Sequence, residues 1–362
     1  MLKRKLCEAA FHWQLDCAGP LLIADGRYSK EKVEEKEKRK GWYPVKFFIN
    51  KTGEEEMIQR VRAVNCPPPH NWGFYVPGTS LRGPFRAQAE RILRSLISQE
   101  KSPGTACDPF EQDKDNQGQP LLGCSTRWER VNGSKGRNPY KEACPACKLF
   151  GFAGLASRIY FDDADIGQGY RSVYRDMIGI DRFTGGVFTQ SKGDGQGGGG
   201  GANMRFHVLE NATFTTTITV INFELWQLGL LAYVFRDFED GLVPIGFGKT
   251  KGFGRVKGKV SKITFSYPQT LPGKTMHHLG SILLEKEYGL YGITPEKAGK
   301  ALGFEFMSPP DDAPGFPLLF SKQEITGKDH IKQFWQKVAP EFNDYLAHLP
   351  AAPQKTAAKE VS

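Results

Sequence analysis

The first clear pattern along the chain is an alternation of apolar and polar residues between positions 11 and 17. Phe11, Trp13 and Leu15 alternate with polar side chains, which is the period of two expected for a strand with one buried face. A Gly-Pro pair follows two residues later and favours a turn. We therefore expect a half-buried strand over residues 11–17.

Two later segments have helical periodicity instead. Residues 79–96 place Phe85, Ala89 and Ile92 at spacings of three and four, after Thr79 or Ser80 as the predicted N-cap. The opposite side of this predicted helix carries four arginines: Arg82, Arg86, Arg91 and Arg94. Residues 224–238 predict a second helix with one apolar face.

Further strands are predicted by β-branched and alternating sequence at residues 157–166, 212–223 and 255–265. A long hairpin is expected over about residues 170–206, with a glycine-rich, mobile tip at residues 193–201. The resulting order is strand, helix, strand, strand pair, helix, strand. We therefore predict an α+β fold, with a ferredoxin-like (RRM-type) sheet that carries its helices on one face.

Three stretches lie outside this pattern. A charged stretch at about residues 30–60 is predicted to be a solvated insert. Residues 267–350 form a mixed C-terminal extension with a helix near its end, and residues 351–362 are predicted to be a disordered tail.

Charge and composition narrow the expected partners. The chain of 362 residues has 49 Lys and Arg against 40 Asp and Glu, so its net charge is +9 and its pI is near 9.1. A positive field favours polyanions such as RNA and DNA. No apolar run of about twenty residues occurs, and the N-terminal sequence lacks the apolar stretch of a signal peptide. We therefore expect a cytoplasmic protein without a membrane partner.

Four of the seven cysteines form a pattern typical of a metal site. They lie in a polar stretch at about residues 100–148: Cys107, Cys124, Cys144 and Cys147. In a reducing compartment, clustered cysteines favour metal over disulfide. The last two form a Cys-x-x-Cys turn, which sets two thiolates on one side of a tetrahedral cation. We therefore predict a structural zinc site, the alternative being four unconnected thiols. Cys66, near His70, is a weaker second metal candidate that we interpret as structural.

The segment PIGFGKTKGFGRVKG, residues 244–258, combines many glycines with cations. Because glycine is costly to order, so many in one segment need a reason. Bare backbone amides beside Lys249, Lys251 and Arg255 suit a phosphate group. The alternative is a flexible basic surface turn, and on this segment alone both interpretations stay open.

Four motifs stand in an order that resembles a known family. They are VPGTSLRGPFR, LFGFAGLASRIYFDDADI, GIDRFTGG and PIGFGKTKGFGRV, and together they span residues 76–256. The set resembles the RAMP superfamily of CRISPR-associated proteins. The cysteine-bearing insertion before LFG is most similar to that of the backbone subunits of type III effector complexes (Csm/Cmr-type). The resemblance covers about residues 1–266, which implies one RAMP domain with a C-terminal extension.

This resemblance implies partners and site residues. Such subunits hold a CRISPR RNA, meet a target RNA and assemble with other RAMP subunits. The glycine-rich loop with Lys249, Lys251 and Arg255 is expected near the guide phosphates, as is the helix start with Ser80, Arg82 and Arg86. The IDR-TG hairpin acts as a thumb that displaces a base pair, and its residues in this chain are Asp181, Arg182, Phe183 and Thr184.

Cleavage of target RNA is expected to depend on an acid after the first strand. Active family members carry one there, and Asp25 is its match, although the loop PLLIADGRYS departs from the usual glycine-rich form. With a divalent metal such as Mg²⁺, a carboxylate at this place promotes attack of a ribose 2′-hydroxyl on the adjacent phosphate. The alternative for Asp25 is a turn with Gly26, and Asp16 is the reserve candidate.

Three other functions stay open. The chain is alternatively a non-cleaving scaffold that grips guide RNA in the same type of complex. A single-chain RAMP endonuclease that processes precursor RNA would use a histidine, but His12 and His207 lie in predicted strands where buried, satisfied histidines are more typical. An unrelated zinc enzyme is disfavoured, because four cysteine ligands leave no open coordination position.

Overall fold

The computed structural model describes residues 4–24, 45–46, 48–49, 73–96, 105–108, 123–130, 138–186, 189–190, 200–201, 204–268, 273–293, 299–308, 311–312 and 321–349. In these ranges no helix is long and apolar enough to cross a membrane. Most of the predicted charged insert at about 30–60, the pair Cys66 and His70, and the predicted tail at 351–362 lie outside the described residues.

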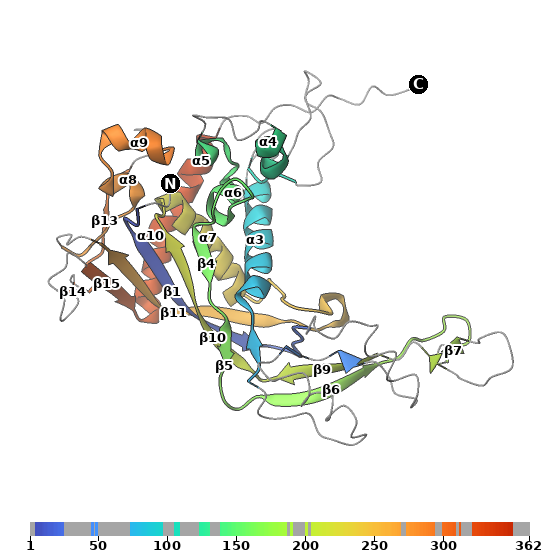
Figure 1. Ribbon diagram of the computed structural model, residues 1–362. Helices are drawn as coiled ribbons and strands as arrows, with labels where there is room; N and C mark the ends of the chain where they lie inside the picture. Colours follow the sequence, from blue (N-terminus) through green and yellow to red (C-terminus); the bar gives the residue numbers. More distant parts are fainter. Residues whose placement is uncertain are drawn as a thin grey trace, which may run out of the picture.

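Among the described residues, eight strands form a central antiparallel sheet (Figure 1). Its order is β14-β15-β11-β1-β10-β5-β3, and β4 also pairs with β10. The core strands are β1 (Glu8–Cys17), β4 (Ile159–Phe161), β5 (Ala164–Ile166), β10 (Thr213–Ile221) and β11 (Val256–Tyr267). Helix α3 (Gly78–Ser95) follows β1, and α7 (Leu225–Glu239) connects β10 to β11. This connectivity and pairing are those of a ferredoxin-like sheet, so the predicted α+β class and element order are confirmed.

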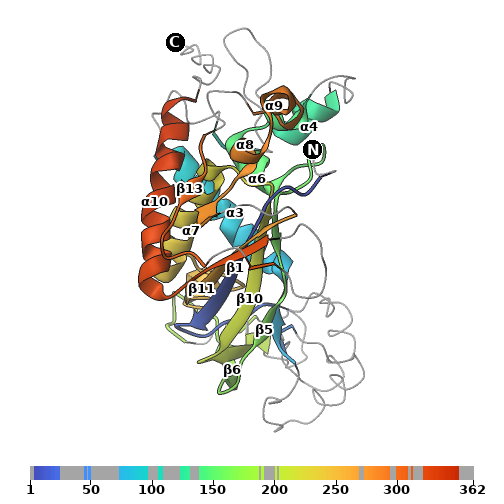
Figure 2. The same ribbon diagram turned by 90° about the vertical axis from the view of Figure 1, so that its left-hand side faces the viewer.

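Helices cover one face of this sheet, as Figure 2 shows for α3, α7 and α10. The predicted alternation in β1 is confirmed, because Phe11 and Trp13 are buried. The Trp13 ring meets Phe85 of α3 and Phe238 of α7 edge-on, with centroids 5.2 Å away in both cases. A Cβ atom at Gly258 of β11 would lie 2.3 Å from the Trp13 ring. Gly258 is therefore explained by core packing.

The C-terminal helix α10 (Lys328–Ala347) covers the outer side of α7. Trp226 of α7 stacks on Tyr345 with ring centroids 4.1 Å apart. Gly229 permits the close approach, because a Cβ atom there would lie 2.6 Å from the Val338 carbonyl oxygen. Helix α7 is therefore buried nearly all round, although the sequence predicted one apolar face. Strand β15 (Ser321–Thr326) extends the sheet beyond β11, and β14 (Asp311–Asp312) pairs with it at the edge.

Two local predictions are wrong, at the strand over 157–166 and at the start of α3. The predicted strand over 157–166 is divided into β4 and β5, and α3 begins at Gly78 without an N-cap side chain at Thr79 or Ser80. Asp163, between β4 and β5, accepts a hydrogen bond of 2.8 Å from the Gly78 amide. The Asp163 carboxylate therefore binds a free amide at the start of α3, in place of the side chain of Thr79 or Ser80.

The predicted long hairpin is formed by β6 (Arg171–Met177) and β9 (Met204–Glu210), which pair antiparallel and project beyond the sheet (Figure 1). Strand β2 (Val45–Lys46) adds to β9, and β7 (Thr189–Gln190) pairs with β8 (Gly200–Gly201). Most of the tip at 193–201 lies outside the described residues. The remaining short elements are β3 (Tyr75–Val76), α4 (Cys124–Arg130), α5 (Pro139–Glu142), α6 (Pro145–Phe150), β12 (Thr275–Met276), α8 (Leu279–Ile282), α9 (Glu285–Tyr291) and β13 (Leu302–Gly303).

Candidate nucleic-acid interface and metal centre

A basic loop, residues 244–255, connects α7 to β11. The 3-10 turn η2 (Lys249–Lys251) forms its outer part. Lys249, Lys251 and Arg255 are exposed, whereas Phe253 is buried and meets Phe206 of the hairpin with ring centroids 5.8 Å apart. The loop therefore has a buried apolar anchor and an exposed cationic side that is open to an anion.

Two glycines of the basic loop are explained by close packing against carbonyl groups of the same chain. All four from Gly246 to Gly254 have positive φ angles. A Cβ atom at Gly246 would lie 2.3 Å from the Leu22 carbonyl oxygen, and one at Gly254 would lie 2.0 Å from the Ile245 carbonyl oxygen. In the family that the chain resembles, such glycines let the backbone approach RNA. At these two positions the structure gives them a role in packing the loop on its own chain.

This packing leads to a stability prediction. Gly254→Ala is expected to lower the free energy of unfolding by about 2 kcal/mol more than Gly252→Ala does. Both positions have positive φ, at +80° and +83°, but a Cβ atom at Gly252 meets nothing within 4 Å. Denaturant unfolding of both variants measures the difference, and equal losses would contradict the packing role.

The segment that leaves β1, residues 18–24, lies between the basic loop and the hairpin. The Gly254 amide donates to the Pro20 carbonyl and the Phe247 amide to the Leu22 carbonyl, both at 2.8 Å. On the other side, Leu21 and Leu209 of β9 exchange two backbone hydrogen bonds. Three regions that the sequence assigned to RNA thus meet at one place. Asp25 follows directly in the chain and lies outside the described residues.

Asp16, the reserve acid, lies near the end of β1 on the sheet face opposite the helices. Its Oδ1 atom accepts hydrogen bonds of 2.8 Å from Gln14 and Thr213. Lys257 of β11 is its neighbour across the sheet and is exposed. These bonds hold the Asp16 carboxylate in one orientation close to the basic loop.

The start of α3 was predicted to be an anion site, and its amides and arginines already have partners within the chain. The Gly78 amide donates to Asp163, and the Ser80 amide donates to the Pro77 carbonyl at 2.8 Å. Arg82 donates to the Phe150 carbonyl, and Arg86 donates to atoms of the cysteine insertion. The predicted contacts of Ser80, Arg82 and Arg86 with RNA stay predictions.

The hairpin presents an ordered turn at residues 181–186. Oδ1 of Asp181 accepts hydrogen bonds from the amides of Phe183 at 2.7 Å and Thr184 at 2.9 Å. These bonds, that from Thr184 first, lower the pKa of Asp181. The Phe183 ring is fully exposed, and Arg182 and Thr184 are exposed beside it. The turn thus holds an aromatic ring in solvent, where a base can stack on it.

His207 is buried, and both nitrogen atoms of its ring have partners within the chain. It is completely buried in β9, its Nδ1 accepts from the Phe48 amide at 3.3 Å, and its Nε2 lies 2.6 Å from the Ser172 hydroxyl. Burial lowers the pKa of His207 to about 4. The expectation of a buried, satisfied histidine is confirmed at this position, and it places the imidazole out of reach of a substrate.

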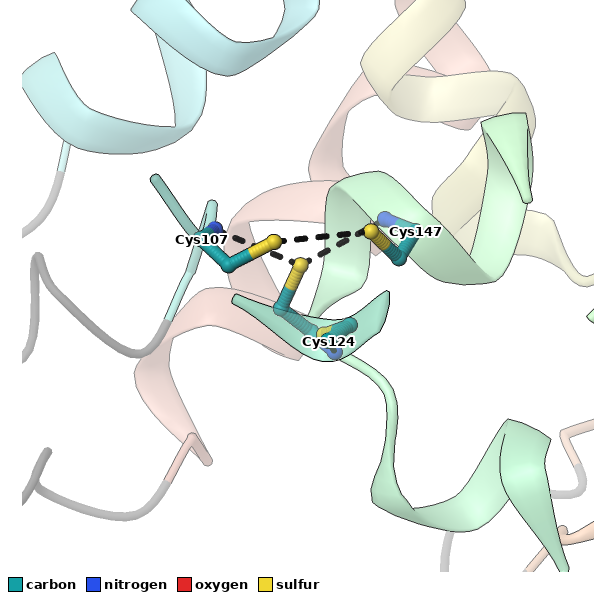
Figure 3. A group of neighbouring side chains, drawn as sticks. Cys107, Cys124 and Cys147 are labelled. Atoms are coloured by element: carbon teal, nitrogen blue, oxygen red, sulfur yellow. Dashed lines mark hydrogen bonds between the residues drawn. The ribbon is translucent and has the colours of Figure 1, made fainter. Parts of the chain in front are cut away.

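The four predicted cysteines come together, with all four sulfur atoms within 4.8 Å of one another. Figure 3 shows sulfur atoms of this group converging from separate segments, and Cys107 Sγ lies 3.6 Å from Cys147 Sγ. Zinc–sulfur bonds of about 2.3 Å in a tetrahedron require sulfur–sulfur distances of about 3.8 Å. The cluster fits a structural zinc ion.

Backbone amides also point at the sulfur atoms of this cluster. Cys144 Sγ accepts from the amides of Cys107 and Cys147 at 3.4 and 3.5 Å, and Cys124 Sγ accepts from the Cys144 amide at 3.3 Å. Such donors stabilise negative charge on sulfur. The pKa of Cys107 is lowered, because the neighbouring thiols donate hydrogen bonds to its sulfur. The pKa values of Cys144 and Cys147 are raised, because each of these thiols donates to Cys107. Bound zinc would replace these shared protons and hold four thiolates.

A buried polar cluster, which the sequence did not reveal, joins the cysteine insertion to the core. The Tyr140 hydroxyl of α5 donates to Glu224 at the start of α7. Arg158 Nη1 lies 3.3 Å from the same carboxylate, and its guanidinium lies 3.8 Å from the Tyr140 ring centroid. All three side chains are buried. No local periodicity marks these residues, because each partner lies more than sixty residues from Glu224.

The model of the RAMP superfamily matches residues 67–257, more than half of the chain. The chain belongs to the RAMP superfamily. Membership implies a CRISPR RNA-binding effector subunit. The matched part of this RAMP protein contains α3, the four cysteines, the hairpin and the basic loop, whereas β1 and the C-terminal extension lie outside it. No curated protein sequence matches the chain.

Proposed function

We propose that this RAMP protein is a backbone subunit, of the Csm/Cmr type, in a type III CRISPR effector complex. It binds CRISPR RNA beside other RAMP subunits and cleaves complementary target RNA. The observation that carries this proposal is the meeting of the basic loop, residues 18–24 and the hairpin base. That region has the exposed cations of the basic loop beside the segment that leads to Asp25, and the hairpin that starts there carries the exposed Phe183 ring on its turn.

Guide binding is assigned mainly to phosphate contacts. Lys249, Lys251 and Arg255 are exposed on one loop, and cations of this kind bind a nucleic-acid backbone without reading its sequence. The hairpin with Phe183 acts as the thumb: the ring stacks on a base and separates guide from target at that position. The cysteine insertion, with one structural zinc ion, is a rigid support beside α3.

Cleavage is assigned to Asp25, with Asp16 as the reserve acid. The carboxylate accepts the proton of a ribose 2′-hydroxyl, whose oxygen attacks the adjacent phosphorus. The bond from phosphorus to the 5′-oxygen breaks, and the 5′-oxygen leaves with the electron pair and takes up a proton from water. The products are a 2′,3′-cyclic phosphate and a 5′-hydroxyl. Alternatively, the carboxylate would hold a divalent ion such as Mg²⁺, which would supply positive charge to the phosphate. The thumb splays the target strand so that the attacking and leaving oxygens are in line.

Reconstitution of the effector with Asp25→Ala tests this assignment. Cutting of a matched target RNA at this subunit's position is expected to fall about 100-fold or more, because a positioned acid or base contributes at least that factor. Target binding, measured by gel shift, is expected to stay unchanged. Asp329→Ala on α10 is the matched control, because it removes an exposed acid far along the chain from the proposed site.

Other outcomes separate the alternatives. Unchanged cutting by Asp25→Ala protein together with lost cutting by Asp16→Asn protein transfers the role to Asp16. No cutting by the unmodified complex, with guide and target bound, contradicts the nuclease and leaves the non-cleaving scaffold. Product ends decide the chemistry, since a 3′-hydroxyl product would exclude attack by the neighbouring 2′-oxygen.

A further inference from the structure

One stripe of α3 carries charged side chains at every fourth position and faces the cysteine insertion. The stripe consists of Arg82, Arg86, Glu90 and Arg94, and side chains at this spacing lie on one side of a helix. Arg82 donates to the Phe150 carbonyl at the end of α6. Arg94 donates to the carbonyls of Ala106 and Cys107 at 3.2 and 3.4 Å. The stripe therefore binds the chain at two places beside the cysteine cluster: at Phe150, three residues after Cys147, and at Ala106 and Cys107.

Arg86 lies in the middle of this stripe, and all three nitrogen atoms of its guanidinium group contact other groups of the chain. Its Nε donates to Glu90 at 2.8 Å, its Nη1 donates to the Gly151 carbonyl at 3.1 Å, and its Nη2 lies 3.5 Å from Cys147 Sγ. Glu90 in turn lies 3.9 Å from Arg94. The guanidinium plane is thus fixed by a carboxylate and a helix-terminal carbonyl before it meets the sulfur.

Charge explains why a cation is placed there. Four thiolates and one zinc ion have a net charge of −2, and this charge is held among buried side chains. Backbone amides supply only partial positive charge to Cys124 and Cys144. The guanidinium of Arg86 supplies a full positive charge to Cys147, the ligand that lies next to α3.

We propose that Arg86 is a positioning residue of the metal centre: its guanidinium holds Cys147 as a zinc ligand and fastens the centre to α3. The inference rests on the proposed zinc site. It gives Arg86 a role within the chain that the sequence did not predict. Groups that hydrogen-bond to metal ligands typically change metal affinity by about 10-fold to 100-fold when they are removed.

The test compares zinc release from the full-length protein and from Arg86→Gln protein, using a coloured chelator. Release from Arg86→Gln is expected to be about tenfold faster or more. Arg91→Gln is the matched control, since Arg91 lies on the same helix and donates to Gln88 at 2.8 Å rather than to the insertion. Its release rate is expected to equal that of the unmodified protein.

A second readout separates positioning from general loosening of the fold. In cobalt-loaded protein, the sulfur-to-cobalt charge-transfer band is expected to shift in Arg86→Gln and to stay in place in Arg91→Gln, because a lost N–H···S bond changes the donor strength of Cys147. Arg86→Lys, which keeps the charge, is expected to restore part of the slow release. Equal release rates and an unshifted band in Arg86→Gln would overturn the proposal. Unmodified protein that binds neither zinc nor cobalt would also overturn the proposal, because the metal site on which it rests would then be absent.

Discussion

Cys144→Ser protein is expected to lose its zinc almost completely, from about one ion per chain to less than about a tenth of that. Cys144 contributes one of four converging sulfur atoms and also caps α6, where its sulfur accepts from the Cys147 amide. The described part of the cysteine insertion consists largely of short helices, so a bound zinc ion is expected to supply much of its folding free energy. Metal analysis after gel filtration measures the occupancy.

Cys17→Ser is the control for this experiment, because Cys17 lies in β1 outside the cluster and its loss should leave the zinc content unchanged. Zinc affinity is also expected to fall as pH falls, since the four thiols must lose their protons to bind the ion. Full zinc occupancy in Cys144→Ser protein would contradict the site. So would metal-free protein obtained without chelators.

The second large effect is expected from alanine at all three cations of the basic loop, Lys249, Lys251 and Arg255. Affinity for guide RNA is expected to fall about tenfold or more at moderate salt, for any guide sequence. For single strands, the loss of three phosphate contacts should also reduce the slope of log K against log salt by about 2. Filter binding over a salt series measures both quantities.

A triple variant with the same change in net charge provides the control. Lys286, Lys328 and Lys332 are exposed on α9 and α10, away from the basic loop in the sequence and on other elements. Alanine at these three positions is expected to leave the affinity and the salt slope close to those of the unmodified protein. Equal effects of the two triple variants would mean that net charge, and not the basic loop, binds the guide.

The parts of the fold that the sequence predicted correctly are those with a local signature. The alternation in β1 shows which side chains are buried, because successive side chains of a strand point to opposite faces. The Cys-x-x-Cys turn and its polar surroundings likewise pointed to a metal, and the four sulfur atoms converge. In β1 neighbouring residues carry the whole signal, and at the metal site the neighbouring pair Cys144 and Cys147 carries its most specific part.

The parts that the sequence did not predict depend on distant partners. The resemblance placed Arg82 near guide phosphates, and the structure adds a contact that the sequence did not predict, because Arg82 donates to the carbonyl of Phe150, 68 residues later. Gly246 is required by the Leu22 carbonyl, far earlier in the chain. Helix α7 is buried all round because α10 covers it. A single sequence shows the charge or the small size of such residues, but not the atom that will face them.

This RAMP protein is expected to hold a CRISPR RNA in its native complex. Purification of the native complex through this subunit, followed by sequencing of the RNA that remains bound after a wash at moderate salt, tests it most directly. The expected result is RNA of defined length that carries CRISPR-repeat sequence at one end. Bound RNA without repeat sequence, or a purified complex without RNA, would show that the protein does not hold a CRISPR RNA.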